Sequence, residues 1–188
     1  MRRSRRAWAA LTILVTALGA AVLPADAAQA TVCPTGWGSG AKAATPSTTT
    51  PVRNVRTGRH TCYDRMVIDI PGAAKNHLGY SVRYVDHLRQ DGSGRLIPVG
   101  GGAVLEVRLS APSYDPRTGK STYPARSGHP LPGVDLTGYR SFRDTRFGAS
   151  FEGDTQLGLG VRTRLPFRVL RVDGQVIVDV DERILMVA

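Results

Sequence analysis

Charged side chains at alternating positions are the first residues in this sequence that could bind a ligand. Arg65 and Asp69 alternate with Met66, Ile68 and Ile70, so in an extended strand they would share the face turned away from the core. A guanidinium on such a face can hold a carboxylate or a phosphate through two parallel hydrogen bonds. The structural alternative is a cross-strand ion pair at the surface, which contributes little stability.

A second copy of this pattern lies near the end of the chain. The segment 175–180, Gln-Val-Ile-Val-Asp-Val, resembles the segment 65–70, Arg-Met-Val-Ile-Asp-Ile, and places Asp179 where the first copy has Asp69. Two related strands, one opening and one closing the domain, would suit a pseudo-symmetric pair of sheets. The pattern Val-x-Asp-Val also arises by chance in strands. Asp179 is a candidate binding residue on the same grounds as Asp69.

Arginines and aromatic residues are interleaved in the segment 139–147. Aromatic faces stack on sugars or bases while arginines hold anions, which makes Arg140 and Arg143 candidate binding residues. The same alternation arises in a strand whose aromatic residues are buried. We therefore expect Phe142 and Phe147 to pack in the core, with solvated arginines around them.

Residues for catalysis or metal binding are not grouped in the sequence. The four histidines stand far apart, at positions 60, 77, 87 and 129, and lack the short spacings of zinc sites. No Gly-x-Ser-x-Gly elbow is present. Glu106 and Glu152 could form the carboxylate pair of a glycosidase, but the sequence does not give their separation. We assign no metal, no cofactor and no catalytic residue.

Strands must position these side chains, because apolar and polar residues alternate through most of the chain from residue 59. Such patterns are typical of half-buried strands, and the turn sequences at 91–94 and 173–174 predict hairpins. Tyr84, in the strand predicted around 80–85, is added to the candidate binding residues. We predict an all-β fold, a small antiparallel β-sandwich of two packed sheets, with a long irregular loop at 112–135.

The N-terminus has the features of a cleaved export signal. Four arginines precede an apolar stretch at 7–23, and Ala28-Gln29-Ala30 offers small residues where a signal peptidase cuts. The alternative is a membrane anchor, although about 17 apolar residues are at the short end of what crosses a bilayer. We expect residues 1–30 to be a signal peptide whose cleavage leaves no transmembrane anchor. The protein would then be secreted and extracellular, with association to the cell wall as one option.

Two cysteines, Cys33 and Cys62, remain after this cleavage. An even number of cysteines in an exported chain predicts a disulfide, which would stabilise the fold by roughly 3–4 kcal/mol on the loop-entropy model. Residues 31–58 are rich in Gly, Ser, Thr and Pro and are predicted to be a linker tied back by this bond. Trp37 within it either packs on the fold or is exposed as a stacking surface.

The exported chain is predicted to be basic. The whole chain has 25 Lys and Arg against 15 Asp and Glu. Residues 1–30 hold four of these cations and one of these anions, which leaves 21 against 14 and a net charge of +7. Positive charge favours anionic partners such as wall polymers, and export makes nucleic acid an unsuitable ligand. We place the β domain at 59–182 and a C-terminal tail at 183–188.

Several segments, in their order and spacing, resemble the AMIN-like domain of secreted actinobacterial proteins. The resemblance runs from about residue 55 to 180 and implies a β-sandwich related to the AMIN domain, which targets amidases and secretin-type proteins to the cell envelope by binding peptidoglycan. The segments that carry it are Tyr63-Asp-Arg-Met-Val-Ile-Asp-Ile70, Gly79-Tyr-Ser-Val-Arg-Tyr-Val85, Asp91-Gly-Ser-Gly94, Leu105-Glu-Val-Arg-Leu109, Leu157-Gly-Leu159, Phe167-Arg-Val169 and Val176-Ile-Val-Asp-Val180.

The sequence as a whole predicts a secreted, non-catalytic binding module of the cell envelope. Its expected ligand is peptidoglycan or another anionic wall polymer. One alternative is a hydrolase of wall material, which requires a cleft with converging carboxylates or histidine. Another is a structural module that binds a protein partner through an open sheet edge.

Overall fold

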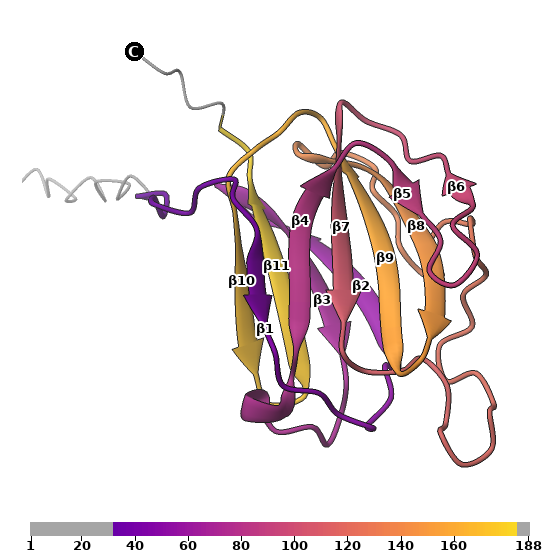
Figure 1. The fold of residues 1–188 in the computed structure, drawn as a ribbon. Helices are drawn as coiled ribbons and strands as arrows, with labels where there is room; N and C mark the ends of the chain where they lie inside the picture. The colour runs from indigo at the N-terminus through magenta and orange to yellow at the C-terminus, as the bar shows by residue number, and fades with distance from the viewer. Residues whose placement is uncertain (1–31, 184–188) are drawn as a thin grey trace, which may run out of the picture. The chain divides into compact units, whose positions relative to one another are not determined.

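Strands with alternating apolar and polar residues build the molecule, as a computed structural model shows (Figure 1). The structure describes residues 32–183. The predicted signal peptide at 1–30 and residues 184–188 of the predicted tail lie outside the described residues. Within 32–183 the chain forms eleven strands and one short 3-10 helix at Lys75–His77 (η1), with no α-helix.

The strands form two large antiparallel sheets. One has five strands in the order β1-β4-β7-β9-β8, and the other has four in the order β10-β11-β3-β2. The strands of the first sheet are Lys42–Ala44 (β1), Tyr80–Val85 (β4), Ala103–Leu109 (β7), Asp154–Val161 (β9) and Phe142–Phe151 (β8). Those of the second are Phe167–Val172 (β10), Gln175–Asp181 (β11), Tyr63–Asp69 (β3) and Asn54–Arg59 (β2).

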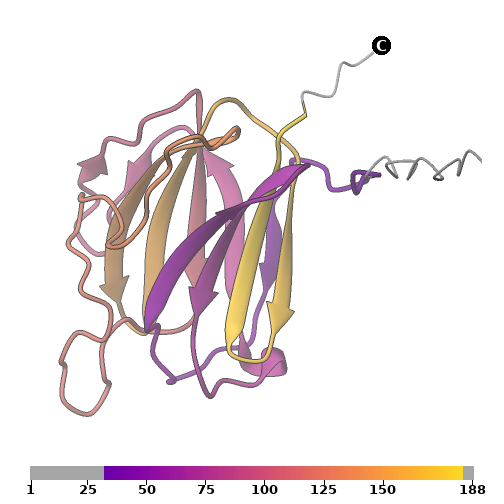
Figure 2. The ribbon, with the colours of Figure 1, turned by 180° about the vertical axis from the view of Figure 1, so that it is seen from behind.

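The two sheets pack face to face, and Figures 1 and 2 show them from opposite sides. Side chains alternate between the two faces of a strand, so each long strand turns one apolar row inward. The core unites fully buried residues of both sheets, among them Met66, Ile68, Leu105, Leu159 and Val178. The predicted small antiparallel β-sandwich is confirmed, and so is the burial of Phe142 and Phe147.

A hairpin covers part of the outer face of the five-stranded sheet. The turn predicted at 91–94 joins β5 (Leu88–Arg89) to β6 (Leu96–Ile97), which pair with each other. Gly158 stands beneath this hairpin on β9, and a β-carbon there would lie 2.5 Å from Cδ2 of Leu88. Because glycine has no β-carbon, the hairpin can approach the sheet closely.

The two copies of the repeated segment are neighbouring strands of one sheet. β3 and β11 pair antiparallel with Val67 opposite Ile177, so the copies at 65–70 and 175–180 run side by side in opposite directions. The structure thus differs from the pseudo-symmetric pair of sheets that we expected, because both strands belong to the four-stranded sheet. The predicted turn Asp173-Gly174 is confirmed as the hairpin between β10 and β11.

Residues 31–58, which we expected to be a linker, contribute two strands to the domain. β1 pairs with β4 at one edge of the five-stranded sheet, and β2 pairs with β3 at one edge of the other. Val52 and Val55 are buried in the core. An edge strand obtains its hydrogen bonds from its neighbour and needs few apolar residues of its own. Residues 31–58 are polar, so their composition did not indicate these two strands.

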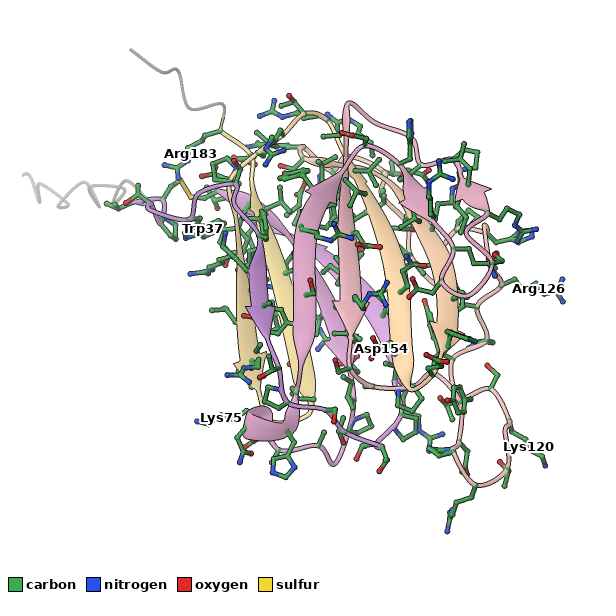
Figure 3. The ribbon with its side chains drawn as sticks, viewed as in Figure 1. Trp37, Lys75, Lys120, Arg126, Asp154 and Arg183 are labelled. Carbon is green, nitrogen blue, oxygen red and sulfur yellow. A yellow bond between two sulfur atoms is a disulfide. The ribbon has the colours of Figure 1, made fainter. Side chains whose placement is uncertain are left out.

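The connection between β7 and β8, residues 110–141, is long and irregular, as predicted for 112–135. Tyr123 and Leu131 within it are buried in the core of the sandwich. Another part extends away from the sheets around Lys120 (Figure 3). The connection is therefore held to the sandwich through its buried side chains, and its projecting part lies between Ala111, which is also buried, and Tyr123.

Candidate binding surface

The outer face of the four-stranded sheet carries the charged side chains that the alternating pattern predicted. Met66 and Ile68 of β3 are buried in the core, so Arg65 and Asp69 point outward, as expected. Asp179 lies on the same face, because the pairing of β11 with β3 sets it opposite Arg65. Figure 2 shows no strand or helix over this sheet. Its outward side chains therefore form a surface.

Asp179 binds two arginines at one end of this surface. Its carboxylate is fully buried and accepts hydrogen bonds from Nε and Nη2 of Arg65, at 2.6 and 2.8 Å, and from Nε of Arg168 at 2.9 Å. The hydrogen bonds that Arg65 donates to Asp179 raise the pKa of Arg65. The side chains of Arg65 and Arg168 remain 23% and 29% exposed. Two cations face one covered anion, so the group presents positive charge to solvent.

Two aromatic rings, those of Trp37 and Tyr63, lie against these two guanidiniums, and a third, His60, packs on Tyr63. The ring of Tyr63 stacks on His60, with centroids 4.5 Å apart, and meets the ring of Trp37 edge-on at 5.5 Å. The guanidinium carbon of Arg168 lies 4.5 Å from the Trp37 ring centroid, and that of Arg65 lies 5.2 Å from the Tyr63 centroid. Each such contact contributes about 0.5–1 kcal/mol at an exposed site. We call these residues the Arg–aromatic cluster: Trp37, His60, Tyr63, Arg65, Arg168 and Asp179.

The N-terminal segment of the domain holds Trp37 in this cluster. The predicted disulfide between Cys33 and Cys62 is present, and it ties the segment to the turn between β2 and β3. Arg183 donates to the carbonyl of Pro34 at 2.6 Å, and Figure 3 shows Arg183 and Trp37 at the same end of the sandwich. Of the two alternatives for Trp37, packing on the fold is the one observed, with part of the indole left exposed.

Asp69 forms a second and more open group at the opposite end of the same surface. It accepts hydrogen bonds from Arg56 at 3.0 and 3.3 Å, from Gln175 at 3.0 Å and from Asn54 at 3.4 Å. The side chains of Arg56 and Asp69 are 52% and 21% exposed. This arrangement is the cross-strand surface ion pair that the sequence offered as an alternative, and such pairs contribute little.

Four members of the cluster were not among the predicted site residues, although exposure as a stacking surface was one alternative for Trp37. Tyr63 stands two residues before Arg65, so the alternation that turns Arg65 outward turns Tyr63 outward as well. Arg168 is recognisable only from the pairing of β10 with β11, which sets it opposite Asp179. His60 lies in the turn between β2 and β3, where no periodicity marks it.

Arg140 and Arg143, predicted from the interleaved segment, do not join the cluster. Arg143 donates to the backbone carbonyls of Tyr139, Arg140 and Phe142 at 2.8–3.1 Å, so it stabilises the turn that leads into β8. Arg140 is exposed and pairs with Glu182 at 2.8 Å. The same arginine lines a hollow near the β2–β3 turn.

The hydroxyl group of Tyr84 forms its hydrogen bonds within the fold. Its hydroxyl donates to the carbonyl of Leu165 at 2.8 Å and accepts from the amide of the same residue at 2.9 Å. The ring packs edge-on against Phe167, and burial raises the pKa of Tyr84. Tyr84 therefore fastens the connection between β9 and β10, and its hydroxyl is not presented to a ligand.

The carboxylates considered for hydrolysis have unlike surroundings. Glu106 is buried on β7, where it pairs with Arg83 at 2.8 Å and accepts from the amide of Gln156 at 2.7 Å. Glu152 is exposed in the turn between β8 and β9. They do not form the open pair that flanks a glycosidic bond in a hydrolase. Within residues 32–183, no group of three or more His, Cys, Asp or Glu side chains is placed to hold a metal ion.

Fold and surface together define a small disulfide-anchored antiparallel β-sandwich with an arginine-rich aromatic face. Residues 50–182 match the family model of the AMIN-like domain. This region covers most of the 188 residues, so the chain belongs to the AMIN-like domain family. No curated protein and no solved structure gave a match.

Membership in this family associates the protein with the cell envelope. The disulfide between Cys33 and Cys62 agrees with an extracellular location, since such bonds persist in oxidising compartments. Across residues 32–183, no helix has the length and apolar character that a membrane crossing requires.

Proposed function

We propose that this AMIN-like domain is a non-catalytic binding module that holds an anionic polymer of the cell wall through the Arg–aromatic cluster. The ligand is peptidoglycan or a charged polymer attached to it. The observation that carries the proposal is the partly exposed pair of guanidiniums, Arg65 and Arg168, fixed by one buried carboxylate beside an aromatic group of Trp37, Tyr63 and His60. The exported, wall-associated location expected from the sequence is part of the same proposal.

The cluster is preorganised for a ligand that combines sugar rings with negative charge. Aromatic rings pack against the apolar faces of sugars, and guanidiniums bind carboxylates or phosphates through paired hydrogen bonds. Asp179, the disulfide and the hydrogen bond from Arg183 to Pro34 fix these groups before any ligand arrives. Less conformational entropy is then lost on binding.

The charge of the domain supports the same class of ligand. Residues 32–183 contain the 21 cations and 14 anions counted above for the exported chain, a net charge of +7. Such a charge attracts polyanions over distances of about a Debye length, and salt screens this attraction. Binding to wall polymers should therefore weaken as the salt concentration rises.

Co-sedimentation with purified, insoluble cell walls tests the proposal. We expect the protein to pellet with walls, and Trp37→Ala or Arg168→Ala to weaken binding about tenfold each, which corresponds to about 1.4 kcal/mol. Arg56→Ala is the matched control, because it removes an exposed arginine from the same sheet face outside the cluster. Its binding should stay within about twofold of the parent.

Two outcomes would contradict the proposal. One is absence of pelleting at low salt, and the other is an equal loss in Arg56→Ala and Arg168→Ala, which would indicate a diffuse charge effect. The non-catalytic part is tested in the same samples, because the walls should release no soluble fragments during incubation with the protein. Mass spectrometry of protein recovered from its native host should find an N-terminus near residue 31.

A further inference from the structure

A hollow of about 450 Å³ lies at the end of the sandwich, beside the Arg–aromatic cluster. It is lined by basic and polar side chains: Arg59, His60, Thr61, Asp64 and Arg140. These residues come from the end of β2, the β2–β3 turn, the start of β3 and the connection before β8. His60 also stacks on Tyr63, so the hollow and the cluster share one residue and adjoin each other.

Arg59 is held in place at this hollow by the backbone of the connection before β8. Its Nη1 donates to the carbonyl of Gly138 at 3.1 Å. Gly138 has φ +76°, and a β-carbon there would lie 2.8 Å from Nη1 of Arg59. Glycine at this position therefore allows both the turn and the close approach of the guanidinium. This hydrogen bond uses one of the five N–H donors of the guanidinium.

Arg140 is held at the hollow by a different part of the chain, near the end of β11. Its Nη1 donates to Oε1 of Glu182 at 2.8 Å, and Glu182 is itself held by a hydrogen bond from Arg162 to its backbone carbonyl. The side chain of Arg140 is 68% exposed, so its other N–H groups remain open to solvent and to the hollow. Two oriented guanidiniums thus border one concave site.

The lining holds one carboxylate, Asp64, beside the guanidiniums of Arg59 and Arg140. Asp64 is buried, and its Oδ2 accepts hydrogen bonds from the amides of Ser141 at 2.5 Å and Phe142 at 3.1 Å. These bonds join β3 of one sheet to the start of β8 in the other. Asp64 is therefore committed to holding the two sheets together.

We propose that this hollow binds a phosphate group, as a site separate from the Arg–aromatic cluster. Donors in the lining come from two parts of the chain: Arg59, His60 and Thr61 are consecutive at the end of β2 and in the β2–β3 turn, and Arg140 belongs to the connection before β8. A tetrahedral phosphate offers oxygens in several directions, whereas a carboxylate offers two oxygens in one plane and suits a single arginine fork. Phosphate groups of a wall polymer fit this arrangement while its sugars lie against the neighbouring aromatic rings.

Amide chemical shifts of the ¹⁵N-labelled protein, followed during titration with inorganic phosphate, test this site. We expect saturable shifts at Thr61, Asp64 and Ser141, whose amides border or anchor the hollow. Acetate, titrated at the same ionic strength, should shift these amides at least about tenfold more weakly. Equal saturation by acetate and phosphate would overturn the assignment to phosphate.

Variants then locate the bound anion. Arg59→Ala and Arg140→Ala should each weaken phosphate binding about tenfold, the loss of one charge-assisted contact. Arg59→Lys keeps the charge but loses the fork, so it should fall between Arg59→Ala and the parent. Arg126→Ala is the control, since Arg126 is exposed and distant from Trp37 in Figure 3. Phosphate affinity that is unchanged in Arg59→Ala and Arg140→Ala would refute the site.

The outcomes separate this inference from the proposed function. If the hollow does not bind phosphate, the titration fails while pelleting with walls still depends on Trp37 and Arg168. If the cluster does not bind walls, pelleting is insensitive to Trp37→Ala while the phosphate titration still saturates. Arg59 and Arg140 are exposed, so their substitutions should leave the amide spectrum elsewhere unchanged, which confirms that the variants are folded.

Discussion

The two ends of the outer sheet face are built on the same strand pattern and have different properties. Across the pair of strands β3 and β11, Arg65 lies opposite Asp179 at one end and Asp69 lies opposite Gln175 at the other. An approximate two-fold axis between Val67 and Ile177 relates these two pairs. At one end the aspartate is fully buried and binds two arginines. At the other it is 21% exposed and forms a surface pair with Arg56.

The segment that precedes the sheet creates this difference. Trp37 and the disulfide at Cys33 and Cys62 bring an aromatic cover to one end of the face only. The first copy of the repeat also has arginine where the second has glutamine, so only one of these two pairs between β3 and β11 is an ion pair. A repeated backbone pattern therefore supplies a scaffold, and the residues added around it decide which end can bind.

Removal of the disulfide should have the largest effect on this comparison. Cys33→Ala with Cys62→Ala opens a loop with a sequence separation of 29 residues, for which the loop-entropy model gives a loss of roughly 3–4 kcal/mol. Urea denaturation measures this loss directly. The variant should also lose wall binding through release of Trp37, while the pair between Arg56 and Asp69 is retained. Unchanged wall binding would mean that the cover is not needed.

Asp179→Ala should destabilise the protein by about 3 kcal/mol, the lower end of the range for a broken buried ion pair. The substitution leaves Arg65 and Arg168 side by side without a shared carboxylate. Equilibrium denaturation in urea gives the value. If Asp179→Ala costs less than about 1 kcal/mol, the two ends are energetically alike and the comparison fails.

Asp69→Ala is the matched substitution at the open end and should have a small effect, about 0–1 kcal/mol. Its partners Arg56, Gln175 and Asn54 can all turn to water, because this end has no aromatic cover. The effect should shrink further in high salt, which screens exposed charges. The difference between the losses of unfolding free energy in Asp179→Ala and Asp69→Ala, measured in one buffer, gives the contribution of the aromatic cover to stability.

The smallest expected effect is a loss of folding stability at alkaline pH. This loss should involve neither end of the sheet face. Burial raises the pKa of Tyr84 and of Tyr123. In the unfolded chain both titrate near the ordinary value of about 10. Above that pH the unfolded state loses protons that the folded state retains, so stability should fall as the pH rises through the folded pKa values.

Tyr84→Phe and Tyr123→Phe should each flatten this alkaline decline. The free energy of unfolding, measured between about pH 8 and pH 11, gives the slope. The ion pair between Arg65 and Asp179 should persist over this range, because the hydrogen bonds that Arg65 donates to Asp179 raise the pKa of Arg65. An unchanged slope in both phenylalanine variants would assign the decline to another group.

Sequence patterns were sufficient for the features that depend on local periodicity. The all-β fold, the turns at 91–94 and 173–174, the outward direction of Arg65 and Asp69 and the burial of Phe142 and Phe147 all follow from alternation and turn chemistry. The disulfide followed from counting cysteines, and the family followed from the order of several short motifs.

Features that depend on which strands become neighbours were not predictable from one sequence. The position of Arg168 opposite Asp179 requires the pairing of β10 with β11, and alternation within one strand carries no information about pairing. The strands β1 and β2 were concealed by the polar composition of 31–58. Arg143 and Tyr84 were assigned to binding because the sequence does not show that backbone groups of the fold already satisfy their polar atoms.

The fluorescence of Trp37 during titration with solubilised wall polymer tests the central claim most directly. The chain has two tryptophans, Trp8 and Trp37, and a protein that begins at residue 31, the N-terminus expected after cleavage, has Trp37 as its single reporter. We predict a saturable change in Trp37 emission whose midpoint equals the affinity from co-sedimentation and which persists in Arg56→Ala. Wall binding that saturates without any change in Trp37 emission would contradict the assignment of the Arg–aromatic cluster as the binding surface.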